Sequence, residues 1–142
     1  MFILTSIPDP TINLLPVIVV GIINMAIGML WYSPYLFGKL WIKSMHKTPD
    51  EAKQGANPFI YIFNTIASLV LAYVLAHLVK YANINTAEMG ATAGFWVWLG
   101  FVVTTVLPVY LYEDRNKMLF ILYIIYQMFA IIIMGVILAI WK

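Results

Sequence analysis

Six polar side chains lie inside long apolar stretches of the chain. All of them carry an amide or a hydroxyl group, so these are the groups available for chemistry there. The six residues are Asn13, Asn24, Asn64, Ser68, Thr104 and Gln127. Such groups can hydrogen-bond between helices, or they can line a narrow polar path for a small neutral solute or an ion. Both interpretations stay open on the sequence alone. The apolar stretches hold no acidic residue, which argues against proton coupling because membrane proton relays normally use a buried carboxylate.

Residue types that ordinarily build catalytic or metal sites are scarce. The chain has no cysteine and two histidines, His46 and His77, which we predict on opposite sides of a membrane, too far apart to share a metal. For His77 we expect a hydrogen-bonded neutral ring, with a ligand or proton role as the alternative. No nucleophile is paired with a base at a common depth. The sequence therefore predicts no enzyme and no catalytic, metal or cofactor site.

The elements that position these side chains follow from composition. Of the 142 residues, 63% are hydrophobic and 10% are charged, whereas a soluble domain has about 45–50% and about 25%. Crossing a hydrocarbon core of about 30 Å takes about 20 mostly apolar residues. Four stretches qualify: 12–31, 59–79, 91–110 and 118–141. We predict one all-α domain over residues 1–142, an integral membrane four-helix bundle. Its thinly spread net charge of +2 excludes nucleic-acid binding.

The segment between the first two spans reads as a short amphipathic helix over residues 34–46, lying in the headgroup plane. Apolar side chains recur on one face of it and lysines on the other. The candidate lipid or ligand contacts here are Trp31, Tyr32, Ser33, Lys39 and Trp41. One interpretation is a rigid bend that anchors the topology. The other is a site for an anionic headgroup or substrate, with Lys39 as the charge and Ser33 as the hydroxyl partner.

Orientation follows from the basic residues of the loops. Six of the eight lysines and arginines lie in the first and third loops, so these loops are predicted in the cytoplasm and both termini outside. The third loop contains Glu113, Asp114 and Arg115, which predict a salt-bridged turn able to contact Lys39 or Lys43 of the first loop. We place the protein in the cell membrane (inner or plasma), crossing it several times.

Small residues mark the expected contact faces. In the third span, Gly90 and Gly94 begin a stripe that continues through Gly100, Thr104 and Pro108, and we expect this whole stripe to face the bundle interior. Pro108 removes one backbone hydrogen bond and predicts a kink near Thr104.

The run from Gly28 to Trp41, with the pattern W-Y-S-P-x-x-F-G-K-x-W, resembles a family of small four-span prokaryotic membrane proteins called domain of unknown function 1761. The resemblance continues through Trp98–Phe101, the turn at Glu113–Arg115 and the stretch from Tyr126 to Trp141. Asp114 stands where a glycine would be more typical. The resemblance implies four spans in a prokaryotic cell membrane and supplies no activity.

Two functional hypotheses remain. The first is a structural or accessory protein that forms a homo-oligomer or binds a larger membrane complex, with membrane lipids as its other partners. The second is a small transporter or channel for a small solute or ion, which would use the polar stripe. An enzyme acting on a lipid or quinone-like substrate is a third hypothesis, and no residue pattern in the sequence supports it.

Overall fold

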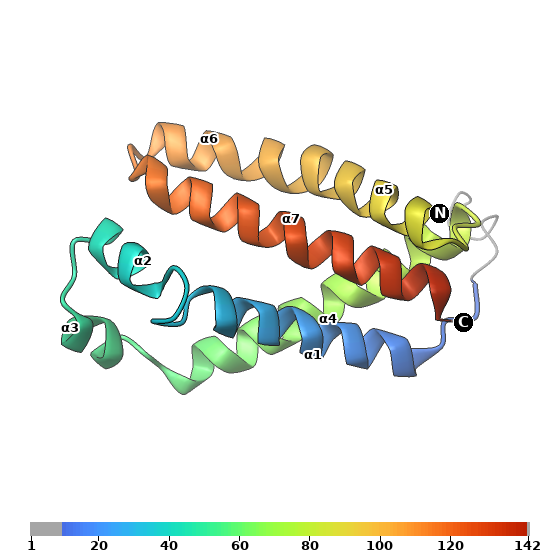
Figure 1. Cartoon of the computed structure of the whole chain (residues 1–142), viewed down its shortest axis with the longest axis horizontal. Coiled ribbons are helices and arrows are strands. Elements are labelled where there is room, and N and C mark those ends of the chain that lie inside the picture. The colour runs from blue at the N-terminus through green and yellow to red at the C-terminus, as the bar shows by residue number, and fades with distance from the viewer. Residues whose placement is uncertain (1–9, 142) are drawn as a thin grey trace, which may run out of the picture.

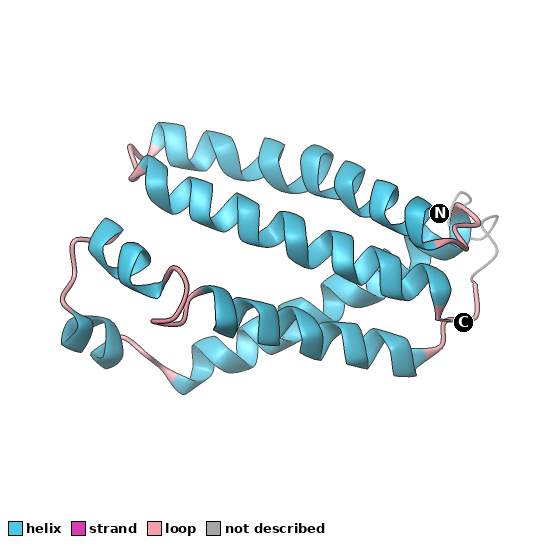
Figure 2. Ribbon diagram, viewed as in Figure 1, coloured by secondary structure: helices cyan, strands magenta, loops and turns pink. Residues whose placement is uncertain are grey.

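The computed structural model describes residues 10–141 and is built from helices and turns throughout that range (Figures 1 and 2). The elements in chain order are α1 (Leu14–Trp31), α2 (Gly38–Ser44), α3 (Pro49–Gln54), α4 (Pro58–Tyr81), α5 (Ala87–Val97), the π-helical η1 (Trp98–Val103), α6 (Thr104–Tyr112) and α7 (Lys117–Ile140). Because α5, η1 and α6 run on without a break, they form one long third span.

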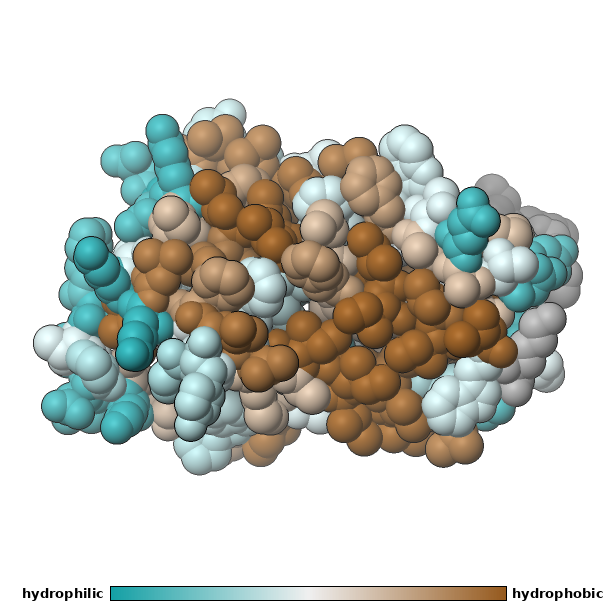
Figure 3. Space-filling view, in the orientation of Figure 1, coloured by the Kyte–Doolittle hydropathy of each residue, from teal (hydrophilic) through white to brown (hydrophobic). Residues whose placement is uncertain are grey.

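Within residues 10–141, four helices are long and apolar enough to cross a membrane. They are α1, α4, the third span Ala87–Tyr112 and α7, with 18, 24, 26 and 24 residues and mean hydropathies of 2.3, 2.0, 1.7 and 2.5. The predicted all-α membrane fold is confirmed, with span ends shifted by a few residues. Figure 3 shows apolar residues across the middle of one face, with hydrophilic residues gathered at both ends, as a membrane-spanning surface requires.

Consecutive spans run in opposite directions, and the molecule has two distinct ends (Figure 1). We call the end that holds α2, α3 and the turn at 113–116 the basic end, because six of the chain's eight lysines and arginines lie there. The start of α1, the turn between α4 and α5 and the end of α7 lie at the opposite end.

Helix α7 is the central element of the bundle. It packs against the third span on one side and against α1 and α4 on the other, and α1 packs along α4. The core between them is made of small and branched side chains. It contains Val17, Val20, Ala72, Leu75, Ala76, Val79, Ile131, Met134, Leu138 and Ala139.

Glycine permits the close approach of α5 and α7. A Cβ atom on Gly90 would lie 2.5 Å from the Gly135 carbonyl oxygen, and one on Gly94 would lie 2.8 Å from the Ile131 carbonyl oxygen. Real Cβ contacts are longer than this, so the two backbones touch only because both positions lack a side chain. Without a hydrophobic driving force in lipid, such close packing is what holds helices together.

The interfacial helix is shorter than predicted. Residues 34–46 were expected to form one helix, but α2 begins at Gly38 and ends at Ser44. The preceding residues form a tight turn, because the amides of Leu36 and Gly38 donate to the Ser33 carbonyl and that of Phe37 donates to the Trp31 carbonyl. A separate short helix, α3, follows, and Thr48 and Glu51 form its capping box.

Candidate functional site

The best-defined polar feature of the described chain is a hydrogen-bonded group in the membrane-spanning part, which we call the polar seam. The Asn24 side-chain amide donates to the Ser68 hydroxyl at 2.8 Å, and that hydroxyl donates to the Gly21 carbonyl at 2.8 Å. The Tyr126 hydroxyl donates to the Asn24 side-chain oxygen at 3.2 Å. The polar seam, made of Asn24, Ser68 and Tyr126, thereby links α1, α4 and α7.

These hydrogen bonds stabilise the bundle because the groups that form them are buried. Asn24 and Ser68 are 6% and 4% exposed, and lipid offers no water to replace a lost partner. Gly21 also lies against α4, since a Cβ atom there would come 2.7 Å from the end of the Leu69 side chain. The arrangement therefore fixes the register of α1 against α4 and α7. Of the six predicted interior residues, Asn24 and Ser68 are brought together as expected.

Gln127 lies apart from the polar seam. Its amide nitrogen donates to the Tyr123 hydroxyl at 3.1 Å, one turn earlier on α7. Its side-chain oxygen is buried with no partner among the described residues, and the same is true of the Trp31 indole nitrogen. A buried polar atom without a partner is costly, so these two atoms are the places where the buried part of the described structure has unused hydrogen-bonding capacity.

Three of the predicted interior residues face outward, and each has a physical reason. Asn13 is exposed because it precedes α1 and caps it, accepting the Leu15 amide at 3.1 Å. Asn64 is exposed because α4 and α1 separate on the basic-end side of Ser68. Thr104 is exposed, and its hydroxyl donates back to the Gly100 carbonyl of its own helix.

The π-helical turn explains why the third-span stripe does not stay inside. Gly90 and Gly94 face α7, whereas Gly100, Thr104 and Pro108 are exposed. Each residue of a π turn advances the helix by a smaller angle than in an α-helix, so η1 rotates the remaining stripe away from its starting face. The helix departs from α geometry at Trp98–Val103, ahead of Pro108, and the kink expected near Thr104 and Thr105 stays a prediction.

The predicted contact segment at the end of α1 is a packed bend. The ring centroids of Trp31 and Phe37 lie 4.4 Å apart. The ring centroid of Tyr32 lies 5.2 Å from that of Trp41 and 5.7 Å from that of Tyr126. Burial is the main reason that the pKa of Tyr32 is raised above its usual value. These aromatic contacts hold α2 beside α7.

Within this bend, the Ser33 hydroxyl proposed for ligand contact already has a structural partner. The Ser33 hydroxyl donates to the Leu30 carbonyl at 2.7 Å. Gly38 is buried, and a Cβ atom there would clash with the Tyr32 carbonyl oxygen. Lys39 is exposed, and Trp41 is half-buried. The geometry suits a rigid anchor, with Lys39 left at the surface.

The turn between α6 and α7 carries the expected salt bridge, in which the Arg115 guanidinium donates to the Glu113 carboxylate. Arg115 also lies 5.6 Å from the Tyr110 ring centroid. Asp114 has a φ of 49°, a left-handed conformation that favours glycine. Among the described residues this turn makes no ion pair with Lys39 or Lys43, and the two loops are linked instead by the Asn116 amide, which donates to the Ser44 carbonyl at 3.0 Å.

Tyrosines are the functional-site residues that the sequence reasoning missed. Tyr126 completes the polar seam, and Tyr123 is the partner of Gln127. The spacing of four residues between Tyr123 and Gln127 was a usable signal. Tyr126 lies in the middle part of α7 and falls outside the four-residue spacing of Tyr123 and Gln127, so this signal did not include it.

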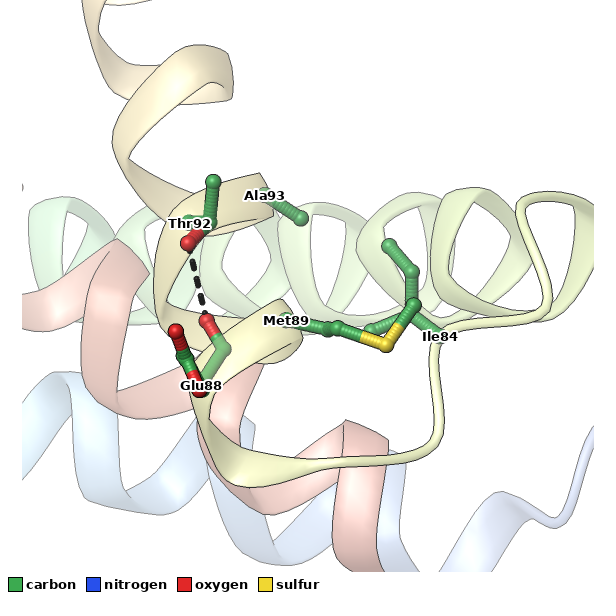
Figure 4. A pocket seen from close by; sticks show the side chains of 5 residues that line it. All are labelled: Ile84, Glu88, Met89, Thr92 and Ala93. Atoms are coloured by element: carbon green, nitrogen blue, oxygen red, sulfur yellow. Dashed lines mark hydrogen bonds between the residues drawn. The ribbon is translucent and has the colours of Figure 1, made fainter.

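A shallow hollow of about 300 Å³ lies at the opposite end of the molecule, beside the start of α5 (Figure 4). It is lined by Ile84, Glu88, Met89, Thr92 and Ala93, and the Thr92 hydroxyl donates to the Glu88 carbonyl at 2.9 Å. Its walls are mainly apolar and Glu88 is its one charged lining residue. Over residues 10–141 no group of three metal-ligating side chains gathers there or elsewhere.

His77 lies in the last third of α4, on the same side of the bundle's midpoint as this hollow. Its Nδ1 atom is 2.8 Å from the Tyr73 carbonyl oxygen, which can only accept, so Nδ1 carries the proton. The Tyr73 ring lies 4.4 Å from the imidazole. The ring is thus hydrogen-bonded within its own helix.

Comparison with known proteins places the chain in a family. The model of the family described as Protein of unknown function (DUF1761) matches residues 15–139. The chain belongs to this family. The match runs from the second residue of α1 nearly to the end of α7, so it covers all four spans and the bend. No curated protein and no solved structure matches the chain significantly.

Proposed function

We propose that this protein is a structural or accessory subunit that acts through helix contacts inside the membrane, as a homo-oligomer or within a larger complex. The observation that carries the proposal is the incomplete packing of the spans. Only 6% of the residues in the most apolar 18-residue window of the third span are buried, against 33% in α7. The face of that span turned away from α7 is therefore available to a neighbouring helix.

Two further features support an assembly role. Every residue from 58 to 67 in α4 is exposed, although the rest of the helix packs against α1 and α7. The polar seam and the bend are engaged in holding the bundle together, and the proposal assigns them no catalytic step. The protein then contributes a rigid bundle with free apolar faces.

The proposal includes a position in the cell membrane with the basic end in the cytoplasm and both ends of the chain outside. Lysines on α2 and α3 would meet anionic headgroups there, which makes membrane lipids a partner. Since the chain has no cysteine, one can be introduced at will. In intact cells, a membrane-impermeant maleimide should label Asn85→Cys and spare Asp50→Cys, and the reverse pattern would contradict the orientation.

Photo-crosslinking from the exposed faces tests the assembly role. A photoreactive amino acid is placed once in each span, at Ile22, Phe63, Phe101 or Phe129, which are 61%, 68%, 69% and 48% exposed. The proposal predicts a defined protein adduct from at least one of these sites, with Phe101 in the third span as the leading candidate. Lipid adducts alone at all four sites would contradict it.

A small transporter or channel is the second candidate, and one observation favours it. The Gln127 oxygen and the Trp31 indole nitrogen are buried polar atoms without partners among the described residues, as the lining of a polar path would be. If the path exists, Asn24→Leu should lower solute flux in reconstituted vesicles without dissociating the protein. Unchanged flux would remove the polar seam from any pathway.

A further inference from the structure

Asn64 is the least satisfied polar side chain on the outside of the spans. It is exposed, and it makes no hydrogen bond to any described residue. Helix α4 has 24 residues, so it is about 36 Å long and extends about 3 Å beyond each side of a 30 Å hydrocarbon core. Asn64 lies about 9 Å from the start of α4, which places its amide about 6 Å inside the hydrocarbon.

The surroundings of Asn64 within the chain offer it nothing. Ser68, one turn further along α4, is the last residue toward the basic end that is buried against α1. Beyond it the two helices diverge, as Figure 1 shows, and α4 stands apart from the bundle. Lipid chains can cover its apolar side chains, but they cannot accept or donate a hydrogen bond to an amide.

The depth of Asn64 restricts what can satisfy it. Copies of one chain insert in the same direction, so a two-fold axis relating them runs along the membrane normal and brings together residues of equal depth. Asn64 of a second copy lies at that depth by symmetry. An asparagine amide carries both donors and an acceptor, so two of them are mutually complementary.

We propose that residues 58–67 of α4 are the surface through which two copies of this chain associate, with Asn64 of each copy hydrogen-bonded to Asn64 of the other. This inference rests on the assembly role proposed above and names the surface and the partner. A buried amide pair between membrane helices fixes register as well as affinity, so it also determines how the copies are oriented.

Disulfide crosslinking tests the surface with a matched pair of positions. Ile60 lies four residues before Asn64, on the same face, whereas Ile62 lies about 160° around the helix, and both side chains are 53% exposed. In native membranes with a permeant oxidant, Ile60→Cys should form crosslinked dimers at least tenfold more than Ile62→Cys. Equal crosslinking at the two positions would overturn the proposal.

The role of the amide is tested in the Ile60→Cys background. Adding Asn64→Leu should lower the crosslinked fraction about five- to tenfold, because it removes the shared hydrogen bonds. Asn64→Gln, which keeps the amide, should retain most of it. The helix content of the Asn64→Leu protein should be unchanged, because Asn64 has no partner in its own chain. An unchanged crosslinked fraction in the Asn64→Leu variant would overturn the proposal.

The outcomes separate this inference from the proposed function. If photo-crosslinking from Phe101 captures a protein while Ile60→Cys fails to crosslink, the assembly role stands and the α4 contact is wrong. If only lipid is captured at every photo-crosslinking site and Ile60→Cys also fails, both are wrong.

Discussion

At the scale of single residues, the molecule depends on side chains that are satisfied within the membrane and on positions that must have no side chain. Asn24 and Ser68 meet the first requirement, and Gly38 and Gly94 meet the second. The hydrogen-bonded side chains and the glycines both hold the helices close together, although the buried core is small. Each can be tested by a single substitution.

Replacing Asn24 with leucine should weaken the bundle. The change removes the bonds from Asn24 to Ser68 and from Tyr126 to Asn24, so we expect the free energy of unfolding to fall by about 1–2 kcal/mol. Reversible unfolding in mixed micelles measures this. The Ser68→Ala variant is expected to cost a similar amount, since it too breaks two bonds of the polar seam. Wild-type stability in both variants would show that the polar seam does not stabilise the fold.

Gly38→Ala should disturb the bend at the end of α1. The new methyl group would clash with the Tyr32 carbonyl oxygen, so the backbone must move, at a cost of about 1–3 kcal/mol. Gly55→Ala is the matched control, because the nearest atom to its Cβ would be 3.6 Å away. Near-ultraviolet circular dichroism reports the packing of Trp31 and Trp41. The spectrum should change for Gly38→Ala alone, and identical spectra for both variants would contradict the packed bend.

At the scale of elements, the four spans could be predicted from the sequence, but which residues of each span face the bundle interior could be predicted only in part. Apolar runs and net composition are properties of the segment alone, so the spans were predictable. The rotation of Gly100, Thr104 and Pro108 to the outside arises from η1, and a π turn leaves no simple periodic signature. Likewise the divergence of α4 from α1, which exposes Asn64, is a matter of crossing geometry that sequence spacing does not encode.

The two halves of the third span should respond differently to the same substitution. Gly94→Ala would place a Cβ atom 2.8 Å from the Ile131 carbonyl oxygen, whereas a Cβ atom at Gly100 would have no neighbour within 4 Å. We expect Gly94→Ala to lower the free energy of unfolding by about 1–3 kcal/mol and Gly100→Ala to leave it unchanged or slightly higher. Comparable losses for the two variants would argue against the rotation at η1.

Helix α3 should unwind at acidic pH. The Thr48 backbone amide donates to the Glu51 carboxylate at 2.7 Å, and this bond is the main cause that lowers the pKa of Glu51 below its usual 4.5. A lowered pKa means that the ionised carboxylate stabilises the helix above pH 4.5 and that this contribution is lost as the pH falls through the lowered value. Amide hydrogen exchange of residues 49–54, corrected for the pH dependence of the intrinsic exchange rate, should show the loss of protection in α3. A Glu51→Ala variant should lack this pH dependence, and the same dependence in that variant would contradict the capping box.

At the scale of the whole molecule, α7 holds a bundle whose outer helices remain largely uncovered. Membership of the family of unknown function covers all four spans, so it supports the architecture without naming an activity. The largely exposed outer face of the third span and the unpartnered Asn64 are the features that support the proposed assembly role. Its function in this account is therefore a property of the assembly it joins.

Native mass spectrometry of the protein released from its own membrane tests that claim most directly. Extraction in a mild detergent keeps lateral helix contacts, and the chain has a mass of 16.2 kDa. The account predicts a dimer or higher multiple of that mass, or a fixed stoichiometric complex with a larger membrane protein. A species that remains a 16.2 kDa monomer with bound lipid alone, under conditions that preserve known membrane complexes from the same extract, would contradict it.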